Sequence, residues 1–273
     1  MAFLALSILC SVAIANLLTW FNKDKRIDIF YIFAGNYCVA SLFSWSTNKI
    51  PVGEADFFDL GLGIVAGAFF LLNFLIYQHN IIKNGQSLAV GVMRVSLLIP
   101  TFLSILVFQE RLLPVKYLGI IIIILSFAYL SFSGQVKSLF LALGLFLVTG
   151  ITDSFMKLYD ELGKAEPSLY IALLFTAALI STILLIIVRK RHFQMRSLAY
   201  GFLLGIPNQL TTKFFMESLT SVKAALAYPL LASGVVLLVI TSDICFWKRK
   251  FNRRTLAAYA ALIIGIMLLN IKW

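Results

Sequence analysis

The residue with the clearest chemical potential is an arginine inside an apolar segment. Arg94 lies about eight residues into the segment 86–108, roughly 12 Å from its end at about 1.5 Å per helical residue. At that depth in a bilayer a guanidinium group is costly unless it faces a cavity or a partner. Helical spacing places Ser87, Gly91 and Thr101 on the same face. We expect Arg94 to contact a substrate; the alternative is a structural arginine satisfied by carbonyl or carboxylate groups.

A second polar group interrupts the apolar segment 197–217. Asn208 and Gln209 follow a proline, and Lys213 comes four residues after Gln209 on the same helical face. We expect all three side chains to contact substrate. In the alternative, Lys213 extends to the membrane surface or pairs with Glu217, which lies four residues further on.

Three further residues are candidates for substrate contact. Asn73 and Tyr77 are four residues apart in one apolar segment, and Tyr228 lies in another. The alternative for each is a hydrogen bond between neighbouring helices. Asp243, one turn from the end of its segment, is expected to face the membrane interface.

The elements that must position these residues are membrane helices. Apolar residues make up 61% of the chain and charged residues 13%, whereas soluble domains have about 45–50% and about 25%. Runs such as 120–125 lack the alternation of barrel strands. The sequence predicts an all-α polytopic membrane protein with about ten transmembrane helices, or nine if the turn near 83–85 is absent. The expected segments are 2–21, 28–46, 59–78, 86–108, 116–134, 138–158, 167–188, 197–217, 222–247 and 254–271.

The two halves of the chain, 1–134 and 135–273, are expected to be related. A shift of 138 residues places Gly63 on Gly201 and Gly67 on Gly205, and the gaps between segments also match. Because five helices per half is an odd number, the second half must enter the membrane inverted. Inverted repeats of this kind are typical of transporters. The glycine pairs themselves are expected to serve helix packing.

The distribution of basic residues predicts the orientation in the membrane. Connections after odd-numbered segments carry fourteen Lys and Arg residues, and the opposite side carries seven. Cytoplasmic loops carry the excess of positive charge. We therefore expect a multi-pass protein of the cytoplasmic (inner) cell membrane with both termini outside.

Residues in the fourth and fifth segments resemble a known family. Pro100, Glu110 and Gly119 are similar to the proline, helix-end glutamate and glycine of EamA-like transporters in the drug/metabolite transporter superfamily. The second half keeps only Pro229 at a roughly comparable place, has Gly265 late in its last segment, and has a lysine at 248 where a glutamate is expected. The resemblance implies ten helices in two five-helix repeats. It also implies cytoplasmic termini, in conflict with the charge count.

Several function classes are disfavoured by the sequence. The net charge of +11 is spread over short clusters between apolar segments, so no nucleic-acid partner is expected. The cysteines Cys10, Cys38 and Cys245 lie in or at the ends of apolar segments, and His79 and His192 are far apart, so no metal site is expected. No phosphate-binding or dinucleotide motif is present, and we expect no cofactor.

The favoured function is a secondary transporter or exporter that moves a small polar metabolite by alternating access. Arg94 and Lys213 favour a substrate with a carboxylate or phosphate. A flippase for a lipid-linked phosphate or sugar is the alternative. An intramembrane enzyme is a second alternative, but it would need a clustered catalytic set that the sequence lacks. The expected partners are the substrate and the lipid bilayer, with a homodimer left open.

Overall fold

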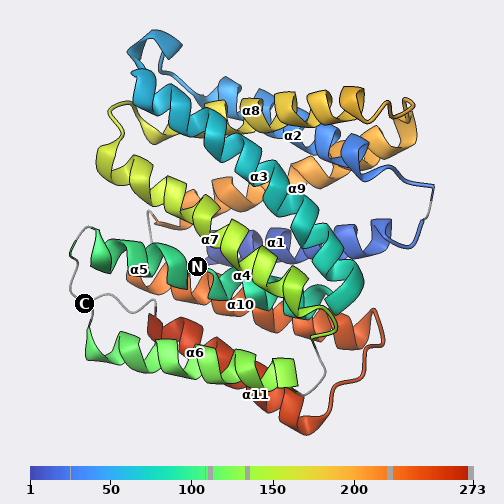
Figure 1. Cartoon of the computed structure of the whole chain (residues 1–273), viewed down its shortest axis with the longest axis vertical. Helices are drawn as coiled ribbons and strands as arrows, with labels where there is room; N and C mark the ends of the chain where they lie inside the picture. Colours follow the sequence, from blue (N-terminus) through green and yellow to red (C-terminus); the bar gives the residue numbers. More distant parts are fainter. Residues whose placement is uncertain (25, 108, 110–112, 133–135, 220–223, 270–273) are drawn as a thin grey trace. The chain divides into compact units, whose positions relative to one another are not determined.

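A computed structural model of the chain describes residues 1–273 apart from 25, 108, 110–112, 133–135, 220–223 and 270–273. Throughout this described part the chain is helical, without a β-strand (Figure 1). The predicted all-α fold is therefore confirmed. The helices are α1 (Ala2–Phe21), α2 (Ile29–Thr47), the 3₁₀ turn Val52–Glu54, α3 (Phe57–Asn84), α4 (Gln86–Val95), α5 (Leu98–Leu106), α6 (Pro114–Phe132), α7 (Leu139–Leu162), α8 (Pro167–Val188), α9 (Met195–Leu219), α10 (Ala224–Cys245) and α11 (Arg253–Leu269).

The protein is embedded in a membrane. Within the described residues, six helical segments are long and apolar enough to cross a bilayer, namely α1, α2, α3, α7, α8 and Gln86–Leu103. Helix α8 also leaves a row of large apolar side chains uncovered, since Ile180, Leu184 and Ile187 are 53%, 55% and 63% exposed. A continuous apolar face of this kind is suited to lipid rather than to water.

Local sequence signals set several helix ends. The Asp28 carboxylate caps α2 by accepting a hydrogen bond from the Phe30 N–H at 2.9 Å. Pro167 begins α8, where its missing N–H leaves no helical bond unmade. Gly85 separates α3 from α4 with a φ of 89°, a conformation that favours glycine. The turn expected near 83–85 is therefore present.

The predicted segment 86–108 contains one candidate membrane span, Gln86–Leu103, but its helix is divided into α4 and α5 by a break at residues 96–97. Pro100 has no N–H to donate to the Ser96 carbonyl, and its ring crowds that carbonyl. The Ile99 N–H bonds to Ser96 instead, at 2.9 Å, in a tighter turn. The Thr101 hydroxyl donates to the Leu97 carbonyl at 2.7 Å. The break is thus a local consequence of the proline.

The chain forms two compact units. The first unit comprises Met1–Thr19, Ile76–Gly150 and Leu210–Trp273, and the second comprises Trp20–Leu75 and Ile151–Gln209. Each unit combines segments of both predicted halves, 1–134 and 135–273. The two compact units are therefore not the two predicted halves, and the inverted repeat of the halves stays a prediction.

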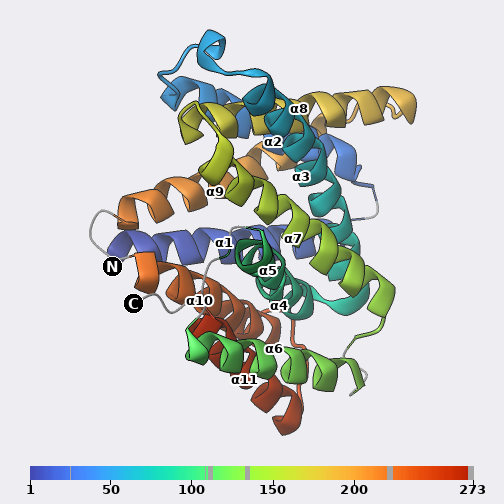
Figure 2. The same ribbon diagram turned by 60° about the vertical axis from the view of Figure 1, so that its left-hand side comes forward.

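In the first unit, α6 and α11 lie side by side, as both views show (Figure 2). A Cβ atom added to Gly119 would lie 2.8 Å from the Leu269 nitrogen, and one added to Gly265 would lie 2.8 Å from the Ile123 side chain. Gly119 thus lies against Leu269. Ile123, four residues further along α6, lies against Gly265, which is four residues earlier in α11. The two helices therefore run antiparallel at close backbone distance.

In the second unit, α2 packs against α8. The hydroxyls of Ser41 and Thr176 are hydrogen-bonded at 2.9 Å, and Ser168 donates to the Asn48 side chain at 3.1 Å. Asn48 comes after Ser41 in α2, whereas its partner Ser168 comes before Thr176 in α8. This pair of helices is therefore antiparallel as well.

Glycines bring two more helices onto this pair. Gly63 and Gly67 place α3 against α8, and Gly201 and Gly205 place α9 against α2. The predicted packing role of these glycines is confirmed, since a Cβ at any of the four would overlap the neighbouring helix. The residues that would be overlapped include Leu173, Leu174 and Ala177 of α8 and Ile32, Gly35 and Val39 of α2.

Candidate functional site

The seven residues predicted to contact substrate are divided between the units. The first unit contains Tyr77, Arg94, Lys213 and Tyr228, and the second contains Asn73, Asn208 and Gln209.

In the first unit, Arg94 occupies the last turn of α4, directly before the break that Pro100 causes. Its side chain is partly buried. Tyr77 of α3, which is 4% exposed, belongs to the same unit, so this unit holds two predicted residues together with the helix break. A guanidinium group can bind a carboxylate or phosphate with two parallel hydrogen bonds, and a phenol can donate or accept one more.

A buried carboxylate that the sequence placed at the membrane interface lies nearby. Asp243 is only 3% exposed, and it accepts hydrogen bonds from the backbone N–H of Ser87, at 3.2 Å, and from the Ser87 hydroxyl. The Arg249 guanidinium lies 3.7 Å from the same oxygen. The prediction that Asp243 faces the membrane interface is wrong, because α4 and the connection after α10 cover this end of α10.

The Arg249 guanidinium joins three parts of the first unit. Besides Asp243, it bonds to the Asn84 carbonyl at 2.7 Å and lies over the Phe251 ring at 5.5 Å. It fills the space beside Gly85 where any other residue would carry its Cβ. The turn between α3 and α4 therefore depends on a glycine and an arginine together.

Polar side chains continue this network toward α1. Gln86, 1% exposed, accepts a hydrogen bond from Thr19 at 2.7 Å and donates to Ser242 at 3.3 Å. The Asn16 carbonyl oxygen accepts bonds from Ser242 and from the Trp247 indole, the latter at 2.7 Å. We call this set the polar lock, since it ties α1, α4 and α10 together at one end. Its members are Asn16, Thr19, Gln86, Ser87, Ser242, Asp243, Trp247 and Arg249.

Sequence reasoning missed the polar lock, although one signal pointed to it. The orientation rule placed the connections 83–85 and 248–253 on the same side of the membrane. Ser87 follows the first connection and Asp243 precedes the second. Polar residues at the ends of these two segments could therefore have been expected to meet.

In the second unit, buried amides gather between α2 and α9. Asn208 donates to the Asn36 carbonyl oxygen at 3.1 Å, Asn36 is fully buried and Gln209 is 5% exposed. The amino groups of Asn36 and Gln209 have no hydrogen-bond partner among the described residues. Buried donors of this kind are rare in native proteins and are suited to an acceptor such as a water, carbonyl or carboxylate. Helix α9 itself continues through Pro207 without a break.

The remaining candidates have different surroundings. Asn73 is buried in α3, at 4% exposure, whereas the Lys213 side chain in α9 is exposed. The Tyr228 side chain and all of Glu110 lie outside the described residues. Over the described chain, no three His, Cys, Asp or Glu side chains gather where they could hold a metal ion.

Comparison with known proteins identifies a relative over nearly the whole length. An uncharacterized protein of Haemophilus influenzae is 26% identical over 269 residues, which cover 90% of each chain. No protein-family model matches the sequence. The similarity therefore spans both predicted halves, and the relative's description states no activity.

Proposed function

We propose that this protein is a secondary transporter or exporter of a small polar metabolite, built like the EamA-like members of the drug/metabolite transporter superfamily. The observation that carries the proposal is the position of Arg94, partly buried in the last turn of α4, directly before a break in a membrane helix. Transporters build their midplane sites from discontinuous helices. The arginine favours a substrate with a carboxylate or phosphate group.

Helix pairing supports the inverted-repeat part of the proposal. Under the 138-residue shift, α2 corresponds to α8 and α6 to α11, and each of these pairs is antiparallel. The glycine contacts are also reciprocal. Gly67 meets Ala177, its counterpart Gly205 meets Val39, and 177 − 39 = 138. With α4 and α5 counted as one broken span, the α-helices of the described residues number ten, which supports the proposal of two five-helix halves.

Loop contacts support the alternation of sides. In the first unit Asn84 bonds to Ser138 and Arg249, and in the second Asp24 pairs with Arg196. These residues all lie in or beside connections after odd-numbered segments. Such connections were expected to share one side, the basic one.

The polar lock is suited to closing one end of a transport path. It joins α4 to α10, the two helices that the 138-residue shift relates, on the side of the basic connections. Alternating access requires a closed end that can open. Hydrogen bonds within membranes are worth only about 1 kcal/mol each, so a polar closure of this kind can be reversed.

A thermal-stability screen tests the proposal. Purified protein would be melted with amino acids, sugar phosphates, nucleosides and a short-chain polyprenyl phosphate, using wild type, Arg94→Ala and Arg94→Lys. We expect one soluble anionic class to raise the melting temperature of the wild type by mass action, and both variants to lose that shift.

The matched control is Arg254→Ala, which removes an exposed arginine elsewhere in the chain. It should keep the wild-type response. Stabilisation by the polyprenyl phosphate alone would favour the flippase. An equal response of wild type and Arg94→Ala would refute the role of Arg94.

A further inference from the structure

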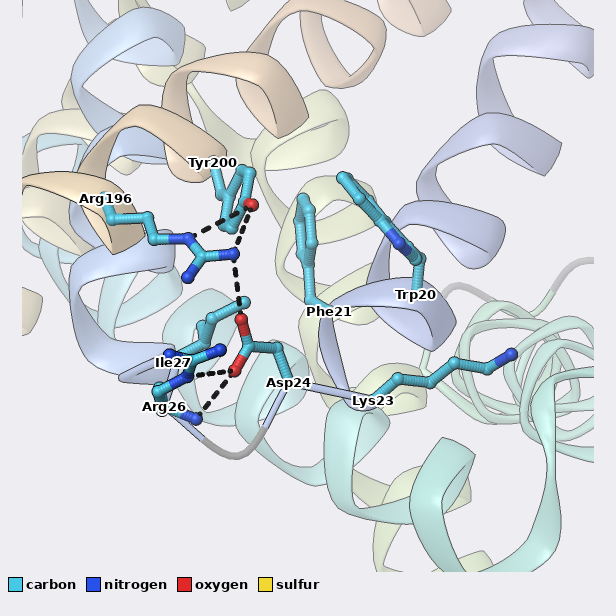
Figure 3. Close-up of a pocket in the computed structure, with 8 residues that line it drawn as sticks. All are labelled: Trp20, Phe21, Lys23, Asp24, Arg26, Ile27, Arg196 and Tyr200. Atoms are coloured by element: carbon cyan, nitrogen blue, oxygen red, sulfur yellow. Dashed lines mark hydrogen bonds and ion pairs between the residues drawn. The ribbon is translucent and has the colours of Figure 1, made fainter.

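A pocket unrelated to Arg94 lies where the connection between α1 and α2 meets the first turns of α9 (Figure 3). Its volume of about 280 Å³ is slightly below that of typical small-molecule pockets, which hold about 300–1,000 Å³. All the lining residues belong to the second unit. They are Trp20, Phe21, Lys23, Asp24, Arg26, Ile27, Arg196 and Tyr200.

The polar wall of the pocket is positively charged and ordered. Arg196 bonds to the Tyr200 hydroxyl at 3.3 and 3.2 Å and pairs with Asp24 at 3.0 Å. Asp24 also accepts the Arg26 backbone N–H at 3.0 Å and pairs with the Arg26 guanidinium at 3.6 Å, although the Arg26 side chain is 85% exposed. With Lys23, the lining has three cations and one carboxylate, a net charge of +2. This arrangement leaves capacity for an anion.

The other wall is aromatic. The ring centroid of Tyr200 lies 5.4 Å from that of Trp20 and 5.1 Å from that of Phe21, and Trp20 is 47% exposed. Tryptophan and tyrosine concentrate at the level of lipid headgroups. The α9 face that carries Arg196 and Tyr200 continues to Leu203, which is 44% exposed. The cationic pocket and an exposed apolar side chain therefore share one face of α9.

We propose that this pocket binds the phosphate of an anionic phospholipid, with Arg26 and Arg196 on the phosphate and an acyl chain along α9 past Leu203. A soluble phosphate ester has the same anionic group but lacks an acyl chain that could contact the aromatic wall and the apolar face. The exposed cations at 189–191, in the connection before α9, add to the positive potential that attracts anionic lipid.

Native mass spectrometry and melting of the full-length protein test the site. Dioctanoyl phosphatidylglycerol should bind and stabilise the wild type, whereas dioctanoyl phosphatidylcholine and glycerol 3-phosphate should bind about tenfold more weakly or less. Arg26→Ala and Arg196→Lys should each lower the phosphatidylglycerol affinity about tenfold. Arg254→Ala, at an exposed arginine that is not among the lining residues, should leave the affinity unchanged.

Trp20 offers a readout that does not depend on stability. Phosphatidylglycerol with brominated acyl chains should quench the wild-type fluorescence more than that of Trp20→Phe, and Arg26→Ala should reduce the difference. Equal phosphatidylglycerol affinity in wild type and Arg26→Ala would overturn the proposal. Glycerol 3-phosphate binding as tightly as the lipid would also overturn it, in favour of a soluble anion site.

Discussion

Arg94 and Asp243 show how differently two charged residues are accommodated in the same unit. Arg94 is partly buried at a helix break, where the backbone is already irregular. Asp243 is buried in a regular helix and has Ser87 and Arg249 as partners. A charge within a membrane protein needs a partner or a cavity. The contacts of Asp243 hold α4 and α10 together, and we propose Arg94 for substrate contact because of its place before the break.

The role of Asp243 can be tested by removing its charge. Asp243→Asn keeps an oxygen for Ser87 but leaves Arg249 without its carboxylate. The variant should unfold about 2 kcal/mol more easily, less than for a fully buried pair because the Arg249 side chain is 26% exposed. Thermal melting of the purified protein measures the change.

The matched control is Glu161→Gln, which makes the same chemical change in an exposed pair with Lys157. Its effect should be no more than about 0.5 kcal/mol. Equal effects of the two substitutions would show that Asp243 contributes no more than a surface carboxylate.

Among the elements, the turn between α3 and α4 is the most constrained by its neighbours. Gly85 has a φ of 89°, and a side chain there would displace the Arg249 guanidinium. Gly85→Ala should therefore lower stability by about 1–3 kcal/mol from backbone strain alone. The melting temperature should fall accordingly.

Gly144→Ala in α7 is the matched control, because nothing lies within 4 Å of a Cβ added there. Alanine favours a helix over glycine by about 1 kcal/mol, so this variant should be at least as stable as the wild type. A destabilised Gly144→Ala with an unchanged Gly85→Ala would contradict the packing described for both positions.

A loop ion pair predicts a pH dependence. Asp56 precedes α3, accepts the Asp59 N–H at 2.9 Å and pairs with Lys164 at 2.9 Å. The Asp59 N–H and the lysine hold the pKa of the Asp56 carboxyl below its ordinary value. The stabilisation is therefore complete above about pH 4, the ordinary aspartate pKa, and is lost as the pH falls through the lowered pKa.

Asp56→Asn should accordingly melt below the wild type at pH 7, and the difference should shrink well below pH 4. The control is Glu54→Gln, in the exposed 3₁₀ turn nearby, which should melt close to the wild type at pH 7. A gap between Asp56→Asn and wild type that stays constant with pH would exclude the ion pair as its source.

For the whole molecule, the open question is its orientation. The twofold excess of Lys and Arg after odd-numbered segments predicts external termini, and the family resemblance predicts cytoplasmic ones. A reporter fused after Trp273 should give active alkaline phosphatase and no green fluorescence. A reporter fused after His192, in a basic connection, should show the opposite. A fluorescent fusion at Trp273 would establish the family's orientation instead.

The sequence by itself determined the helical membrane class and several helix ends, and it identified Arg94 as a candidate site residue. These are local properties, because the length of an apolar run, a capping Asp28 or a charge deep in a segment does not depend on distant neighbours. Pro100 also carried the signal for the break after α4, but a proline's effect varies with context. Helix α9 continues through Pro207, whereas the segment 86–108 is interrupted.

Only the tertiary structure decided which residues meet. The buried Asp243 carboxylate accepts hydrogen bonds from Ser87, which lies 156 positions earlier in the chain. Asn208 likewise donates to Asn36, which lies 172 positions earlier. Composition also leaves open how segments divide into units, and each unit takes helices from both halves. The physical reason is that a polar group in a membrane is stabilised by whichever partner packing brings to it, and packing depends on the complementary surfaces of helices that are distant in the sequence.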